Sequence, residues 1–254
     1  MKFIECQQGT EEWHQARSGL ITASMFSVIC NMVGELTPQQ KKYVDLILSG
    51  MPEKEAIAEA GYKAKPSSVS ISKAVKGEPY TDYSDEAKRY AADLAMERIS
   101  KRMYGTPPKA WILNRGHEME VVARRLYEAR TGAFVTEAGI CVDGTGIGYS
   151  TDGLVDDDGL IEIKAPIDSI KIEDMWRTGD VSEYIHQVQG GMWITGRKWC
   201  DFIMYVPALE SVGKDLYIKR IERDDKFIDD MVIKLGAFEK LIFQKEAFFS
   251  QKVA

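Results

Sequence analysis

Residues 159–166 (GLIEIKAP) read as a short apolar strand that is interrupted by two charged side chains. Because successive side chains of a strand point to opposite faces, Glu162 and Lys164 share one face, and Ile161 and Ile163 share the other. A carboxylate and an ammonium among apolar residues are costly to bury unless they pair with each other or perform a function. The segment therefore predicts a strand with one core face and one charged face.

A second carboxylate, Asp152, stands ten residues before Glu162, and the turn sequence VDDDG lies between them. This pattern predicts a hairpin whose fold-back brings Asp152 beside Glu162 and Lys164. Two hard carboxylates suit Mg²⁺, and such a site fits metal-assisted phosphodiester hydrolysis. Spacing alone leaves an ordinary cross-strand salt bridge on a solvated face as an equal alternative.

Composition narrows the class of protein. The 254 residues are 44% hydrophobic and 10% aromatic, with 33 basic and 39 acidic side chains, which excludes a disordered chain. No run of about 18 apolar residues and no secretory signal is visible, so we expect no membrane span and a cytoplasmic protein. The pI near 5.3 argues against a basic nucleic-acid coat protein but not against a nucleic-acid enzyme, since local charge in a cleft decides contact. Four dispersed cysteines indicate reduced thiols.

Local patterning predicts the fold class. Helical spacing dominates up to residue 131, strand-like patterns with Gly/Asp turns cover 134–166, and further strands follow at 198–208 and 215–223. A helical segment around 182–195 lies between the strands of 134–166 and the strand at 198–208, and another at 224–249 follows the last strand. We therefore expect an α/β or α+β fold, with a mixed central sheet flanked by helices.

Several sequence blocks together resemble one nuclease family. The string from Asp152 to Lys164 resembles the PD-(D/E)xK nuclease motif, with Thr151 where that motif usually has proline. The whole chain resembles the phage lambda exonuclease and YqaJ-type viral recombinase family through EEWHQARSGLITAS, RGHEMEVVARRLYE, YSTDGL with IEIKAP, and YIHQVQGGMWITG, in that family's order. The resemblance implies a restriction-endonuclease-like core over residues 1–254 as a single nuclease domain, with a helical insertion at 36–76.

The resemblance also implies a catalytic set. Asp152 would bridge two Mg²⁺ ions, for which Mn²⁺ can substitute. Glu162 would bind one ion together with the backbone carbonyl of Ile163, and Glu120 would bind the other. Lys164 would orient the attacking water and stabilise developing charge.

The position of Glu120 has support from the sequence itself. It lies in the first turn of a helix predicted for about 116–131, where a carboxylate is favoured. Glu118, two residues earlier, is a competing candidate, and the family register favours Glu120.

A second group resembles the family's pocket for a terminal 5′-phosphate: Arg17, Ser24, Ser150 and Gln187. A guanidinium binds phosphate through a planar fork of donors, and hydroxyls and amides add neutral hydrogen bonds. Trp176 and Arg177, expected in a loop after the catalytic strand, are candidates for contact with duplex near the site.

The implied activity is that of an exonuclease that digests the 5′-ended strand of linear double-stranded DNA and leaves 3′ overhangs for recombination. The resemblance further implies a homotrimeric ring, cooperation with a single-strand annealing protein, and a phage or prophage protein acting in the bacterial cytosol. The alternatives are a repair or restriction-type PD-(D/E)xK endonuclease and a non-enzymatic DNA-binding packaging adaptor.

The stretch 36–76 departs from the lambda enzyme's pattern. Pro near a helix start and Gly at two helix ends predict three short helices. The stretch resembles the small helix-turn-helix modules of phage terminase small subunits, whose third helix reads the major groove. A helical insert that packs on the nuclease body or lines its DNA entrance is an equal alternative.

Overall fold

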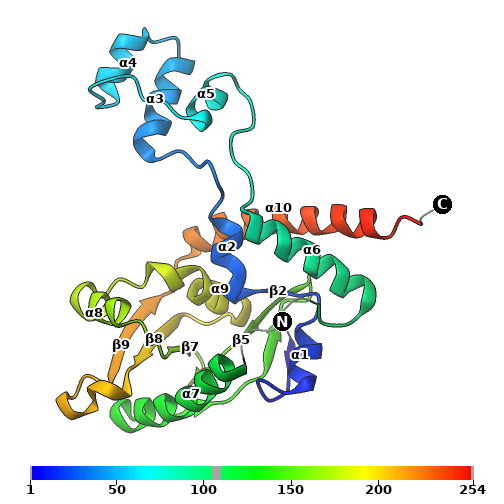
Figure 1. The fold of residues 1–254 in the computed structure, drawn as a ribbon. Helices are drawn as coiled ribbons and strands as arrows, with labels where there is room; N and C mark the ends of the chain where they lie inside the picture. Colours follow the sequence, from blue (N-terminus) through cyan, green and yellow to red (C-terminus); the bar gives the residue numbers. More distant parts are fainter. Residues whose placement is uncertain (1, 105–109, 253–254) are drawn as a thin grey trace. The chain divides into compact units, whose positions relative to one another are not determined.

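The computed structural model describes residues 2–104 and 110–252, and the backbone alone for 110–114. The chain divides into two compact units (Figure 1). The larger unit comprises Met1–Cys30 and Arg89–Ala254, and the smaller unit comprises Asn31–Lys88. Among the described residues, no helix combines the length and the apolar character needed to cross a membrane.

The larger unit contains two mixed sheets. The first has the strand order β1-β4-β5-β2, and the second has the order β3-β6-β7-β8-β9. The pairs β2–β5 and β7–β8 are parallel and the other pairs are antiparallel. The strands are β1 (Lys2–Ile4), β2 (Ile21–Thr22), β3 (Val135–Thr136), β4 (Ile140–Val142), β5 (Ile147–Ser150), β6 (Gly153–Val155), β7 (Gly159–Lys164), β8 (Trp199–Tyr205) and β9 (Leu216–Glu222). The predicted mixed α/β class is confirmed, although the strands divide between two sheets instead of forming one central sheet.

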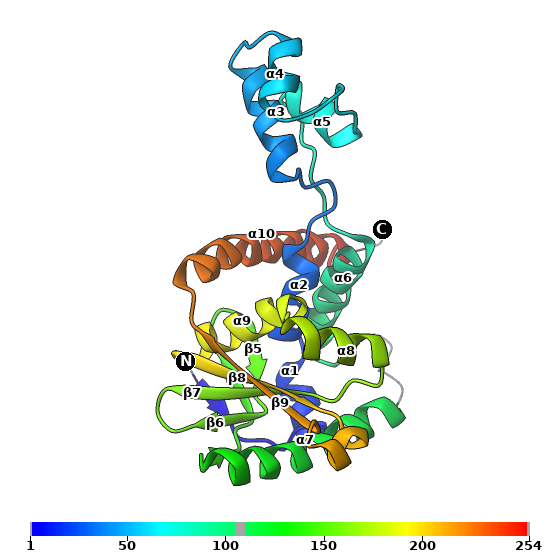
Figure 2. The same ribbon diagram turned by 90° about the vertical axis from the view of Figure 1, so that its left-hand side faces the viewer.

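Helices cover both faces of the five-stranded sheet. Helix α7 packs on one face, where its Ala123 and Tyr127 join a buried cluster with Ile161 and Ile163 of β7. Helices α8 and α9 lie along the opposite face (Figure 2). The helical elements are α1 (Glu11–Arg17), η1 (Ala23–Met25), α2 (Phe26–Cys30), α6 (Asp85–Ser100), α7 (Ala110–Thr131), α8 (Ser169–Thr178), η2 (Ser182–Tyr184), α9 (Ile185–Thr195), η3 (Pro207–Val212) and α10 (Asp225–Phe249).

The predicted hairpin is present as β6–β7. Gly153 pairs with Ile161 and Val155 pairs with Gly159, so Asp152 directly precedes the paired region. The segment GYSTDGLV is not one strand, however, because β5 belongs to the other sheet and β6 begins only at Gly153. A side chain at Gly153 would place its Cβ 2.2 Å from Val135 Cγ1, so the position of the Val135 side chain beside β6 requires glycine here. Asp152 therefore lies where the chain passes from one sheet to the other.

The segment after β7 differs from expectation. Trp176 and Arg177 lie in helix α8, not in a loop. The Asp168 carboxylate accepts hydrogen bonds from the backbone N–H groups of Ile170 and Lys171, and Gly179 ends the helix with φ 63°. An N-terminal Asp cap and a left-handed Gly are the usual signals of helix ends, and both were visible in the sequence.

The smaller unit consists of three short helices, α3 (Pro38–Leu48), α4 (Glu53–Glu59) and α5 (Val69–Val75), as predicted for 36–76. They enclose a core of Tyr43, Val44, Ala56, Ala60, Ile71 and Ala74. Helix α3 begins with a capping box between Thr37 and Gln40. An antiparallel bridge between Val33 and Asp82 joins the entering and leaving segments.

Candidate active site

One cavity gathers the side chains that the sequence singled out. A cavity of about 180 Å³ in the larger unit is lined by the side chains predicted for the metal and phosphate groups: Asp152, Glu162, Lys164, Glu120, Arg17, Ser24, Ser150 and Gln187. They come from α1, η1, β5, the β5–β6 connection, β7, α7 and α9. At about 30 Å³ per water molecule, the space has room for an ion and a phosphate group but not for a duplex.

Glu162 lies at the centre of this group and is 1% exposed. Its Oε2 accepts a hydrogen bond from the Tyr149 hydroxyl at 2.8 Å. Its Oε1 accepts from Lys164 Nζ at 2.7 Å and from Gln187 Nε2 at 2.5 Å. The Glu162–Lys164 ion pair is thus buried at the carboxylate, and the alternative of a salt bridge on a solvated face is excluded.

Asp152 lies beside Glu162, as the hairpin predicted. Its carboxylate is buried, and its Oδ2 accepts the backbone N–H of Ile163 at 2.6 Å. The side chain of Ile163 is in the core, so this residue reaches the site through its backbone alone. Burial raises the pKa of Asp152 well above its usual value, and the charges of Glu162 and Glu120 add to that rise.

Glu120 projects from α7 into the same cavity. The helix begins at Ala110, so Glu120 lies near its middle, and the prediction that it lies in the first turn is wrong. Burial raises the pKa of Glu120, and the interactions with His117 and Lys164 oppose that rise in part. His117 Nδ1 is 3.4 Å from Glu120 Oε2. Glu118 is exposed, so the structure brings Glu120 and not Glu118 into the carboxylate group.

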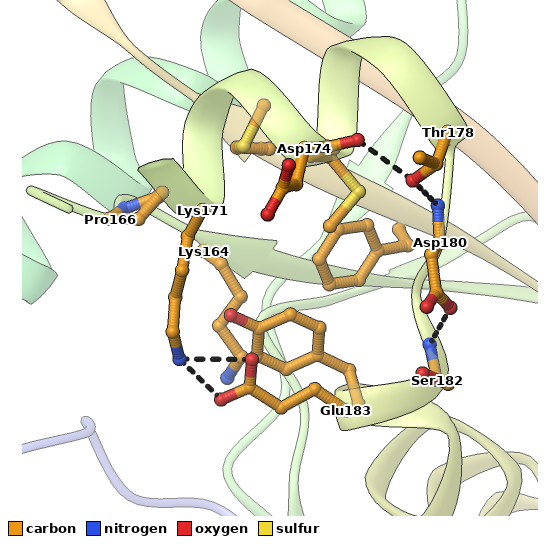
Figure 3. A pocket seen from close by; sticks show the side chains of 12 residues that line it. Lys164, Pro166, Lys171, Asp174, Thr178, Asp180, Ser182 and Glu183 are labelled. Atoms are coloured by element: carbon orange, nitrogen blue, oxygen red, sulfur yellow. Dashed lines mark hydrogen bonds and ion pairs between the residues drawn. The ribbon is translucent and has the colours of Figure 1, made fainter. Parts of the chain in front are cut away.

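Lys164 holds its proton firmly. Burial lowers its pKa, but the charges of Glu162 and Asp152 outweigh that effect and raise the pKa above its ordinary value. The ammonium can therefore donate hydrogen bonds to a water or a phosphate oxygen, but it is not a base near neutral pH. Lys164 also lines a second cavity of about 340 Å³ beneath α8, where Lys171 pairs with Glu183 (Figure 3).

The three carboxylates match the chemistry of a hard divalent cation. Their oxygens are the ligands that Mg²⁺ prefers, and an ion would offset the crowded negative charge, which adds to the effect of burial in raising the pKa values of Asp152 and Glu120. Among the described residues, no three or more Asp, Glu, His or Cys side chains are placed so that they could together hold a metal ion as they stand. Open coordination, completed by water, is usual for Mg²⁺.

Trp13 contacts two residues of the predicted phosphate-binding pocket. The Arg17 guanidinium lies 4.2 Å from the centre of the Trp13 ring, and the Trp13 Nε1–H donates to Ser150 Oγ at 2.8 Å. Burial lowers the pKa of Arg17. Ser24 is exposed in η1, and its Oγ is 3.3 Å from the hydroxyl of Thr22. Arg17, Ser24 and Ser150 thus offer one charged and two neutral partners to an anion.

Gln187 contacts both the predicted phosphate-binding pocket and the carboxylates. The sequence predicts Gln187 as a residue of that pocket, and in the structure its side-chain amide donates a hydrogen bond to Glu162. Gln187 therefore lines the predicted phosphate-binding pocket and also holds the Glu162 carboxylate in place.

Tyr149 is the main residue that the sequence did not indicate. It is fully buried on β5, and burial together with the charge of Glu162 raises its pKa well above the usual value. A Cβ at Gly191 of α9 would lie 2.7 Å from Tyr149 Cζ, so the ring needs that glycine. The Gly190–Gly191 pair in a predicted helix was a visible signal of close approach, although it does not name the partner.

A larger cavity borders the carboxylates on another side. It measures about 940 Å³ and shares Gln8, Glu120 and Asp152 with the small cavity. Arg124 also lines it and has a buried Nε without a hydrogen-bond partner among the described residues. Glu120 and Asp152 therefore lie between a small polar pocket and a larger cavity.

Comparison with known proteins finds one family and several similar structures. The family model described as the YqaJ-like viral recombinase domain matches residues 12–198. The alkaline exonuclease LHK-Exo from Laribacter hongkongensis is 29% identical with a TM-score of 0.64, and the match covers 94% of this chain and 96% of that one. The same enzyme in complex with dAMP gives a TM-score of 0.66 at 29% identity, with the same coverage.

A more distant structure shows the fold alone. A phage related exonuclease from Haemophilus somnus 129PT is 18% identical with a TM-score of 0.52, and the match covers 74% of this chain and 92% of that one. No curated protein matches the sequence significantly.

Proposed function

Since the chain belongs to the YqaJ-like viral recombinase family, we propose that it is a Mg²⁺-dependent exonuclease acting on linear double-stranded DNA. It digests the 5′-ended strand in the 5′ to 3′ direction and leaves 3′ single-stranded overhangs for recombination by single-strand annealing. The observation that supports this most strongly is the convergence of three carboxylates, an ammonium and an arginine on one small cavity.

The proposed metal ligands are Asp152, Glu162, Glu120 and the backbone carbonyl of Ile163. Two bound divalent ions, Mg²⁺ or in its place Mn²⁺, would polarise a phosphoryl oxygen and lower the pKa of bound water. The hydrogen bonds from Tyr149 and Ile163 hold the Glu162 and Asp152 carboxylates in place.

Lys164 donates hydrogen bonds and does not act as a base in this proposal. Its raised pKa keeps the ammonium charged, so it orients the attacking water and stabilises negative charge on the phosphate. Gln187 shares the Glu162 oxygen with Lys164 and thereby limits the positions open to that ammonium.

The terminal 5′-phosphate binds in the pocket formed by Arg17, Ser24, Ser150 and Gln187. Arg17 is held over Trp13, so its planar donors are already oriented when the phosphate arrives. An anchored end places the first phosphodiester beside the carboxylates. Ends that carry a 5′-phosphate are therefore the preferred substrates.

We further propose a homotrimeric ring that acts in the bacterial cytosol with a single-strand annealing protein. A ring of heterologous, head-to-tail contacts encloses the duplex. Encirclement lets an acidic chain stay on DNA, because only the channel wall needs positive charge. Size-exclusion chromatography with light scattering measures the oligomeric state directly.

The activity is tested on three substrates in the presence and absence of Mg²⁺: linear duplex with 5′-phosphate ends, the same duplex with 5′-hydroxyl ends, and a covalently closed circle. The proposal expects metal-dependent digestion of linear DNA, faster from 5′-phosphate ends, and no cutting of the circle. Cutting of the circle would indicate a restriction-type endonuclease, and no digestion of any substrate would indicate a DNA-binding adaptor.

A further inference from the structure

The smaller unit, Asn31–Lys88, takes no part in the site described above. Its charges are divided along the sequence: residues 60–77 contain four lysines and no acidic residue, whereas the rest of the unit contains all nine of its acidic residues. Helix α5 lies within this basic stretch.

Helix α5 has one buried and one exposed face. Ile71 and Ala74 are buried in the core of the unit. Val69, Ser72, Lys73 and Lys76 follow the i, i+3, i+4, i+7 spacing of a single helix face, and all four are exposed. The Ser68 hydroxyl caps the helix by accepting the backbone N–H of Ile71 at 3.1 Å. The exposed face is therefore held in a fixed orientation on a packed unit.

The lysines of this face are not among those of the unit that form ion pairs. Lys42 pairs with Glu59 at 3.1 Å and Lys65 pairs with Glu53 at 2.5 Å. Lys73 and Lys76, like Lys41, Lys54 and Lys63, form no ion pair within 4.0 Å with any described residue. Lys73 is nevertheless near enough to Asp82 to help lower the pKa of that carboxyl, after the larger effects of Lys88 and the backbone of Tyr83. Their charges are thus available to an external anion.

We propose that the exposed face of α5 binds double-stranded DNA through its phosphate backbone and needs no free end to do so. Lysine and serine side chains are common phosphate donors, and Ser72, Lys73 and Lys76 supply both kinds. The absence of acidic residues from 60–77 removes a source of repulsion toward the polyanion. An α-helix fits the major groove, which is about 12 Å wide, with flanking phosphates in reach of such side chains.

This inference goes beyond the proposed exonuclease activity and does not rest on it. The phosphate pocket at Arg17 recognises a strand end, whereas a lysine and serine face recognises the backbone anywhere along a duplex. A chain with both surfaces has a second attachment to its substrate that is independent of the 5′ terminus.

The test uses a hairpin-capped duplex dumbbell that has no ends, titrated with the full chain in EDTA at several salt concentrations. The double variant Lys73→Ala/Lys76→Ala is compared with Lys41→Ala/Lys54→Ala, which removes the same charge from exposed positions elsewhere in the same unit. Each lost phosphate contact is expected to reduce the slope of log K against log salt by about 0.9, so the α5 variant loses close to two units of slope and the control loses little. Circular dichroism checks that both variants are folded.

A second variant, Ser72→Glu, leaves both lysines in place and adds an opposing charge on the same face, so it is also expected to weaken dumbbell binding. Equal effects of the α5 and control double variants, or an unchanged salt slope in both, would overturn the proposal. Binding of polyglutamate in preference to the dumbbell would likewise overturn it and indicate an acidic protein partner. Because the dumbbell has no 5′ end, failure here leaves the exonuclease proposal untouched, and the reverse also holds.

Discussion

The hydroxyl of Tyr149 donates to Glu162 Oε2 at 2.8 Å, which links a strand of the four-stranded sheet to a strand of the five-stranded sheet. Both residues are buried. The geometry of the carboxylate at the centre of the site therefore depends on how the two sheets pack against each other.

Replacing Tyr149 with phenylalanine tests this link. Loss of a hydrogen bond to a charged group costs about 1.5–3 kcal/mol, so Tyr149→Phe is expected to lower the free energy of unfolding and to slow cleavage at least tenfold. The matched control is Tyr127→Phe, which removes the 2.7 Å hydrogen bond to buried Asp201 outside the cavity. Urea unfolding and initial cleavage rates measure both effects. If the two variants lost activity equally, Tyr149 would have no special role in positioning Glu162.

Metal binding is testable without a cleavage assay. In the wild type, Mg²⁺ is expected to raise the melting temperature at pH 8, because a ligand that binds only the folded chain stabilises it. Asp152→Asn keeps the shape of the side chain but removes a charged ligand, so its melting temperature is expected to respond much less. Thermal melts over a Mg²⁺ titration measure the difference. The same Mg²⁺ response in both proteins would place the metal elsewhere.

The pH dependence of stability should include a contribution from His186. Burial lowers its pKa, and the positive charge of Lys234 adds to that shift. A base with a depressed folded-state pKa contributes stability above its unfolded pKa, near 6.5, and that stability is lost as the pH falls toward the folded value. The wild type is therefore expected to lose more stability than His186→Gln between pH 7.5 and 5. Thermal melts over this pH range measure the loss of stability. An equal loss in the two proteins would contradict the prediction.

Arg17→Ala separates end recognition from bond cleavage. The variant is expected to lose most of the advantage of a 5′-phosphate over a 5′-hydroxyl end, since the fork of donors held over Trp13 is gone. Digestion rates on the two end types give the ratio directly. Lys171→Ala, which removes a surface ion pair with Glu183, serves as the charge-matched control. Equal losses on both end types would argue against the phosphate anchor.

The sequence predicted those parts of the site that local rules determine. The period of a strand and the turn before Gly159 were sufficient to bring Asp152 beside Glu162, and the family register distinguished Glu120 from Glu118. The division into two sheets was not predictable in the same way, because it depends on which strands pair: β5 pairs with β2 and β4, whereas β6 pairs with β3 and β7. Such pairing joins residues far apart in the chain.

Tyr149 was missed for the same reason. Its position in YSTDGL reads as an ordinary strand residue, and its partner lies 13 residues away on a strand of the other sheet. Helix α8 is a different case: the cap at Asp168 and the stop at Gly179 were visible, and helix-end rules would have placed Trp176 in a helix.

The most direct measurement of the central claim is the release of nucleotides from a 5′-phosphorylated linear duplex in Mg²⁺ by the wild type and by Asp152→Ala, Glu162→Ala and Lys164→Ala. Each variant is first shown by circular dichroism to be folded. The account predicts that the wild type shortens the 5′-ended strand and that all three variants lose cleavage. Wild-type turnover in any folded variant of this set would contradict the assignment of the active site.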